Sequence, residues 1–209
     1  MSVNFQNFKP YSYYKKTSSN KEKIPSTKAL IGSAAGVLAG MVIGPSLVKG
    51  ARIKNNTLKE VIEMLSMAGL ANLFSVLTSS VGINKEAKKK KWHEAGFQIM
   101  NTSIPMLMVS AVNEICNKKE ALNNKPTKII GSIVAMASGA MLATKITNLD
   151  KKVNEPKRKY SIKDSVANFD DVVATIVIGF PQYEKLNNVA KSILPFIYTY
   201  CGARAGNKE

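Results

Sequence analysis

Long uncharged apolar runs, separated by short basic segments, dominate the pattern of this chain. About 20 apolar residues in a helix, at about 1.5 Å each, cross a hydrocarbon layer of about 30 Å. Four runs approach or reach that length, and the shortest of them reaches it if its flanking lysines extend outward. These runs cover residues 29–48, 64–83, 95–112 and 129–144.

Two further runs, 172–181 and 192–203, are shorter and are typical of core, re-entrant or interfacial helices. All six runs are rich in Ala, Leu and Met and show no alternation of apolar and polar positions, so helices are predicted rather than strands. The sequence therefore predicts an all-α helical bundle, embedded in a membrane, with four to six helices. Its helical domain covers residues 28–209.

Residues 1–27 form a basic, aromatic segment with no apolar stretch of the kind a secretory signal needs. One interpretation is an interfacial tail, with aromatic rings at headgroup depth and lysines on anionic lipid. The other is a disordered terminus.

Glycine recurs at every fourth position through the first run. Residues four apart share one face of a helix, so these glycines make a groove without side chains. The pattern resembles a glycine zipper, the repeated GxxxG packing motif of many membrane helices, and implies close helix packing. A tight core helix in a soluble bundle is the alternative. The glycines are Gly32, Gly36, Gly40 and Gly44.

The fourth run carries a similar series of small residues, Ala135, Gly139 and Ala143. Small residues let two helix backbones approach closely. We therefore expect the first and fourth helices to pack together.

Short matches between two parts of the chain predict an internal repeat, with halves 28–116 and 126–206. The clearest match pairs the segment around Gly32 with the segment around Gly131. Three helices per half would place the halves in opposite orientations, as in many transporters.

The charge is strongly basic, with 30 Lys and Arg against 14 Asp and Glu and a net charge of +16. Only Arg52, Arg158 and Arg204 are Arg, the side chain that best reads phosphates and base edges, so no specific nucleic-acid partner is predicted. Anionic lipid headgroups attract Lys equally well. The predicted loops on one side of the membrane, which include both termini, carry about twice as many Lys and Arg as those on the other side. Because basic loops stay on the cytoplasmic side, both termini are predicted there.

The sequence offers few residues for chemistry. It has two cysteines, one histidine and no recognisable catalytic motif, so neither an enzyme nor a metal or cofactor site is predicted. Asp170 and Asp171 precede the fifth run, and carboxylates inside a bilayer suggest a proton or cation site. Their alternative role is at the N-terminus of a helix. Asn72 and Asn101 are candidate intramembrane polar positions, for a polar path or for hydrogen bonds between helices.

Three functions remain open at this stage. The first is a non-catalytic integral membrane protein with a structural, scaffold or assembly role, in a homo-oligomer or with other membrane subunits. The second is a small transporter or channel built from inverted three-helix repeats. The third is a soluble or membrane-surface bundle, which the near-neutral mean hydropathy of −0.07 keeps open.

Overall fold

The computed structural model describes residues 26–149, Val173, Val177 and 184–207. This part of the chain is all-α, with five long helices and no strand, which confirms the predicted fold class. A single 3-10 turn, η1 (Glu120–Leu122), also occurs. The helices are α1 (Thr27–Gly50), α2 (Asn56–Ser79), α3 (Lys85–Lys118), α4 (Lys125–Thr147) and α7 (Glu184–Gly206).

Capping side chains determine where the first four helices begin. Ser26, Asn55, Asn84 and Asn124 each accept a hydrogen bond from the backbone N–H three residues ahead. Helices α2 and α3 therefore start eight to ten residues before their apolar runs. The predicted runs located the helices correctly but not their starts.

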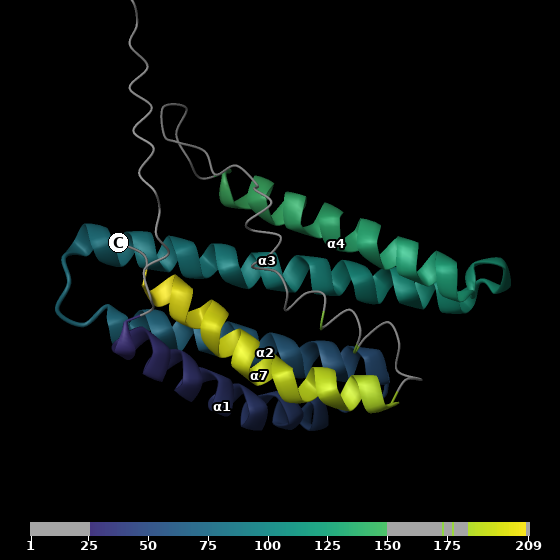
Figure 1. Cartoon of the computed structure of the whole chain (residues 1–209), viewed down its shortest axis with the longest axis horizontal. Helices are drawn as coiled ribbons and strands as arrows, with labels where there is room; N and C mark the ends of the chain where they lie inside the picture. The colour runs from purple at the N-terminus through teal and green to yellow at the C-terminus, as the bar shows by residue number, and fades with distance from the viewer. Residues whose placement is uncertain (1–25, 150–172, 174–176, 178–183, 208–209) are drawn as a thin grey trace, which may run out of the picture.

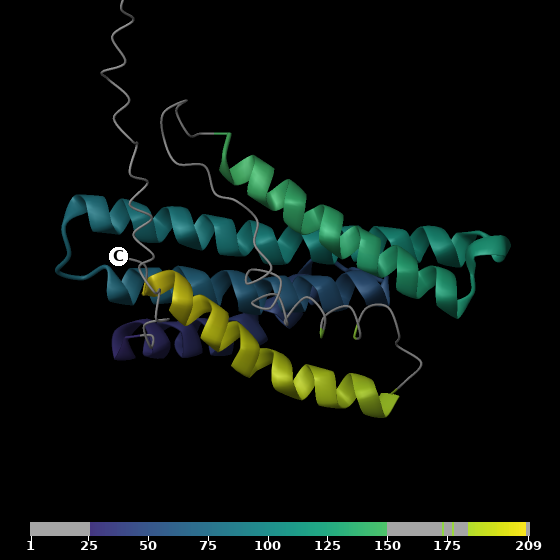
Figure 2. The same ribbon diagram turned by 45° about the horizontal axis from the view of Figure 1, so that its top comes forward.

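Helices α1 to α4 run up and down in succession, and α3 lies between two groups of helices (Figures 1 and 2). On one side α3 packs against α2 and α7, and on the other side it packs against α4. Helix α1 lies on the outer side of this assembly and packs against α2 and α7. The expected packing of α1 along α4 is therefore wrong.

The last helix packs against both α1 and α2. Gly202 lies against Ser33 of α1 and Ala71 of α2. The Ser26 N–H donates to Asn207 Oδ1 at 3.1 Å, so both ends of the described bundle meet at one place. Helix α4 also ends at this end of the bundle, whereas α7 begins at the opposite end (Figure 1).

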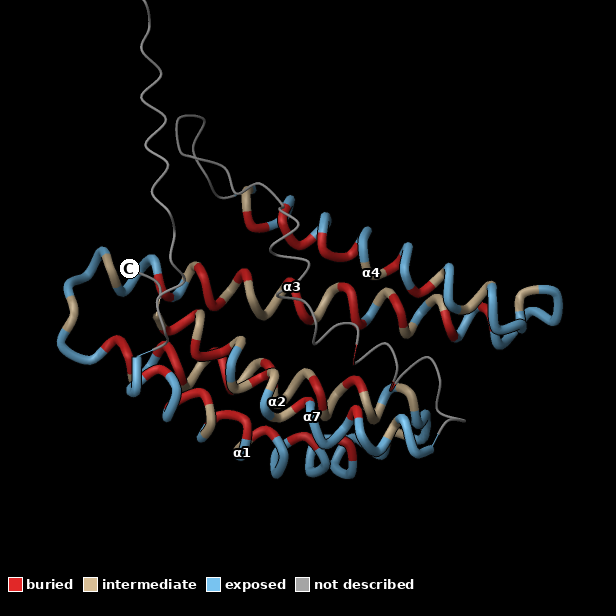
Figure 3. Tube along the Cα trace, viewed as in Figure 1, coloured by how far each residue is buried: buried red, intermediate tan, exposed pale blue. Residues whose placement is uncertain are grey.

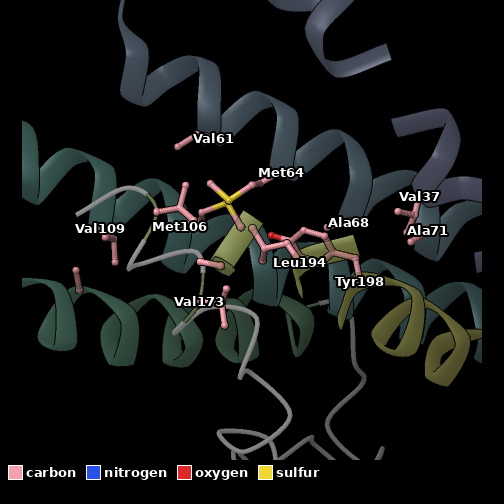
Figure 4. Packing of buried hydrophobic residues seen from close by; sticks show 13 residues of the cluster. Val37, Val61, Met64, Ala68, Ala71, Met106, Val109, Val173, Leu194 and Tyr198 are labelled. Carbon is pink, nitrogen blue, oxygen red and sulfur yellow. The ribbon is translucent and has the colours of Figure 1, made fainter. Parts of the chain in front are cut away.

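The largest apolar cluster lies where α2, α3 and α7 meet. Figure 4 shows Met64, Met106, Leu194 and Tyr198 within it. Val173 and Val177 are helical and buried in the same cluster. They are the only described positions of the fifth predicted run. Asp170 and Asp171 lie outside the described residues, and the repeat halves stay a prediction.

Most large apolar residues of α1 and α4 are exposed, whereas most of the buried positions of these two helices carry small or polar residues. Figure 3 shows the exposed outer sides of both helices. Val42 is 70% exposed and Ile130 is 62% exposed. Ser33, Asn72 and Ser75 are buried. Helices α1 to α4 are each long and apolar enough to cross a membrane.

Candidate functional site

The four regularly spaced glycines of α1, from Gly32 to Gly44, all face α2 at very short range. An added Cβ at Gly40 would lie 2.5 Å from Met67 Cα, and one at Gly36 would lie 2.8 Å from Ala71 Cα. Gly32 and Gly44 meet α2 in the same way, at Phe74 and Glu63. This glycine face is therefore occupied by α2 of the same chain, and it contributes to the fold itself.

Gly139 of α4 packs on α3 instead of α1. An added Cβ there would lie 2.6 Å from Pro105 Cα. The connection between α3 and α4 is short, which makes the two helices antiparallel neighbours. Small residues permit close approach to any neighbour, so their spacing alone does not choose the partner.

Hydroxyl groups link α1 to its two neighbours. Ser75 Oγ donates to the Ala29 carbonyl at 3.0 Å, and Thr78 Oγ1 donates to the Lys28 carbonyl at 2.8 Å. Ser33 Oγ donates to the Tyr198 carbonyl at 3.4 Å and so reaches α7. Polar side chains here act between helices, as in many membrane bundles.

The two predicted polar positions, Asn72 and Asn101, are both buried, on α2 and α3 respectively. Asn72 Nδ2 donates to the Ala68 carbonyl of its own helix at 2.8 Å. Asn72 Oδ1 has no hydrogen-bond partner among the described residues. Asn113 of α3 is buried as well, and its Nδ2 donates to Ser132 Oγ at 3.3 Å, which joins α3 to α4.

Lys91 is a buried cation that joins three helices. Its Nζ donates to the Gly206 carbonyl at 2.6 Å and to the Ser79 carbonyl at 3.2 Å. These carbonyls end α7 and α2, where helix dipoles favour positive charge. The ammonium of Lys91 therefore fixes both helix ends to α3.

Sequence reasoning missed this role, because Lys91 belongs to a lysine block that resembles a membrane loop. The structure places the block Lys88–Lys91, and His93 after it, within α3. The signal was Asn84, whose capping of the helix puts Lys91 one turn before buried Ala95, on the same face.

A cavity of about 170 Å³ lies between α1, α2 and α7, at the end of the bundle opposite Lys91. Lys191 Nζ forms an ion pair with Glu60 Oε1 at its rim, at 2.6 Å. Glu63 also lines the cavity. Most of the other lining is apolar, from Met41, Pro45, Met64, Met67, Val177, Leu194 and Pro195.

No family model, curated protein or solved structure matches this chain. Within the described residues, no group of three His, Cys, Asp or Glu side chains is placed to hold a metal ion. The described part of the chain therefore defines the class by its fold: a helical bundle with four helices long and apolar enough to cross a membrane.

Proposed function

We propose that this protein is a non-catalytic, multi-pass membrane protein with a structural or assembly role. The observation that carries the proposal is that α1 and α4 expose most of their large apolar side chains, while mostly small or polar residues face the neighbouring helices. Leaving one Leu, Ile or Val side chain in water forgoes roughly 1.5–3 kcal/mol of burial. Lipid, or a neighbouring membrane subunit, removes that penalty for the whole outer face.

The contacts between helices suit the same environment. Lipid gives apolar helices no hydrophobic reason to associate, so close backbone packing and hydrogen bonds between helices hold them together. The glycine face of α1 and the hydroxyl bonds of Ser33, Ser75 and Thr78 are contacts of these two kinds. A scaffold role fits a chain whose clearest features concern packing.

Helix α3 supports contact with anionic headgroups. Its 34 residues extend about 51 Å, well beyond a hydrocarbon layer of about 30 Å. Its first turns carry exposed Lys85, Lys88, Lys89 and Trp92, at positions that share one helix face. Lysine and tryptophan together are typical of the headgroup region.

We propose that both termini lie on the cytoplasmic side. The meeting of Ser26 and Asn207 supports one common side for the two ends of the bundle. Among the described residues, the two ends of the bundle carry similar numbers of Lys and Arg. The predicted charge bias therefore rests on residues 1–25 and 150–164, outside the described part.

The first test is membrane fractionation followed by an alkaline carbonate wash. We expect the protein to stay in the membrane pellet and to need detergent for extraction. Nitroxide spin labels at Val42 and Ile133 should then relax faster in the presence of a lipid-soluble paramagnetic agent. A control label at Lys119 should relax faster with a water-soluble one. Release by carbonate would favour the soluble or membrane-surface bundle instead.

A small transporter or channel is a second candidate, favoured by the buried, unpartnered Oδ1 of Asn72 in the described interior. Buried polar groups without partners are rare and need explanation. We expect a transporter to lose ion flux in proteoliposomes when Asn72→Leu or Asp170→Asn is introduced, while the protein still folds. Equal flux in wild type and variants would exclude this candidate.

A further inference from the structure

We propose that the cavity between α1, α2 and α7 binds an amphipathic primary amine. The ammonium group would lie at Glu63, and the apolar part would lie against the methionines. This site goes beyond the proposed membrane role, and detergent-solubilised protein is sufficient to test it.

The apolar walls set the size and character of the ligand. The cavity of about 170 Å³ is close to the roughly 150 Å³ cavity that holds a benzene molecule in a small protein. Met41, Met64 and Met67 line it, and unbranched methionine side chains adapt to irregular apolar groups. A chain or ring of about six carbon atoms would fit such a space.

The charges at the rim leave one carboxylate available. Glu60 is already paired with Lys191. The other nearby lysine, Lys59, donates to Asn56 Oδ1 at 3.2 Å. Glu63 makes no direct hydrogen bond or ion pair with any described residue, although the charges of Lys191 and Lys59 act on it. It is therefore the rim carboxylate with open positions for a bound cation. A partly buried carboxylate is stabilised when a cation pairs with it.

Each of two prolines in the cavity wall leaves one helix carbonyl without its usual backbone donor. Pro45 and Pro195 lie inside α1 and α7 and have no backbone N–H. The carbonyls four residues earlier, at Met41 and Lys191, therefore lack their helical donor. Both of these residues line the cavity. A primary ammonium, like that of lysine, offers three N–H donors, whereas a quaternary ammonium offers none.

The same chemistry has two sources, a phosphatidylethanolamine headgroup and a free alkylamine. Glu60 and Glu63 lie in the first two turns of α2. If α2 crosses the bilayer, this is the depth where headgroups meet acyl chains. The experiment must therefore separate a lipid from a soluble ligand.

The test uses n-hexylamine as the probe on the full chain in a non-ionic detergent, with n-hexanol and hexanoate at matched concentrations. We expect hexylamine to raise the midpoint of thermal unfolding more than either analogue does. Glu63→Gln should weaken the apparent affinity for hexylamine at least tenfold. Each variant is compared with itself without the probe, so a change in basal stability does not affect the result.

Two further variants make the test specific. Glu114→Gln removes a carboxylate that is paired with Lys118 on α3 and does not line the cavity, so it should leave the hexylamine response unchanged. Glu60→Gln should weaken the response, because it releases Lys191 to pair with Glu63. Equal shifts from hexylamine and hexanol, or a full response in Glu63→Gln, would overturn the proposal.

Nanodiscs identify the natural source. If phosphatidylethanolamine nanodiscs suppress the hexylamine response relative to phosphatidylcholine nanodiscs, the lipid headgroup occupies the site. An equal response in both supports a free amine as the ligand.

Discussion

Replacing Gly36 with Ala is expected to lower the free energy of unfolding by about 1–3 kcal/mol. The added Cβ would collide with the backbone of α2 at Leu70 and Ala71. Backbone atoms cannot move aside as a flexible side chain can, so α1 and α2 must separate. Thermal unfolding in detergent, followed by circular dichroism, measures the loss.

Gly69→Ala is the matched control, on the other helix of the same pair. An added Cβ at Gly69 meets nothing within 4 Å. Alanine in a helix interior is favoured over glycine by roughly 0.8–1 kcal/mol, so this variant should be neutral or more stable. The two identical substitutions should therefore have opposite signs. Similar effects from both would show that α1 and α2 do not pack at this distance.

Lys91→Met is expected to destabilise the protein by roughly 2–6 kcal/mol, since two buried carbonyls lose their donor at about 1–3 kcal/mol each. Methionine keeps most of the side-chain length and removes the ammonium. The last turn of α7 loses its bond to α3, so amide hydrogen exchange at residues 203–207 should accelerate. Exchange and thermal unfolding together measure the change.

Lys90→Met provides the comparison, because Lys90 is the exposed neighbour in the same turn. Surface substitutions of this kind usually change stability by less than about 0.5 kcal/mol. Unchanged hydrogen exchange in the Lys91 variant would mean that α7 does not depend on this cation.

Apolar length located the helices because hydrophobic runs and α-helices coincide over most of their extent. The helix starts were missed because they depend on single capping residues such as Asn55 and Asn84. The partner of α4 was missed for a different reason. Ala135, Gly139 and Ala143 specify a close approach, but the short connection to α3 decides which helix approaches.

The same distinction applies to the candidate site: features within one segment can be predicted from the sequence, and contacts between distant segments cannot. Asn72 and Asn101 are buried, as polar residues within apolar runs of a membrane bundle are expected to be, and their intramembrane position stays a prediction. Lys91 and the Glu60–Lys191 pair depend on residues far apart in the chain, which come together only when α7 packs against α1 and α2. No spacing within one segment encodes such a meeting.

The packing of α7 against α1 also bears on biosynthesis. Helix α1 is synthesised well before α7, which contacts it around Ser33. At about 5–20 residues per second, α1 and α2 wait on the order of ten seconds for Gly202. Until then the small, polar groove that α7 fills is open, so the nascent α1–α2 hairpin is the stage at which a chaperone or insertase has most to protect.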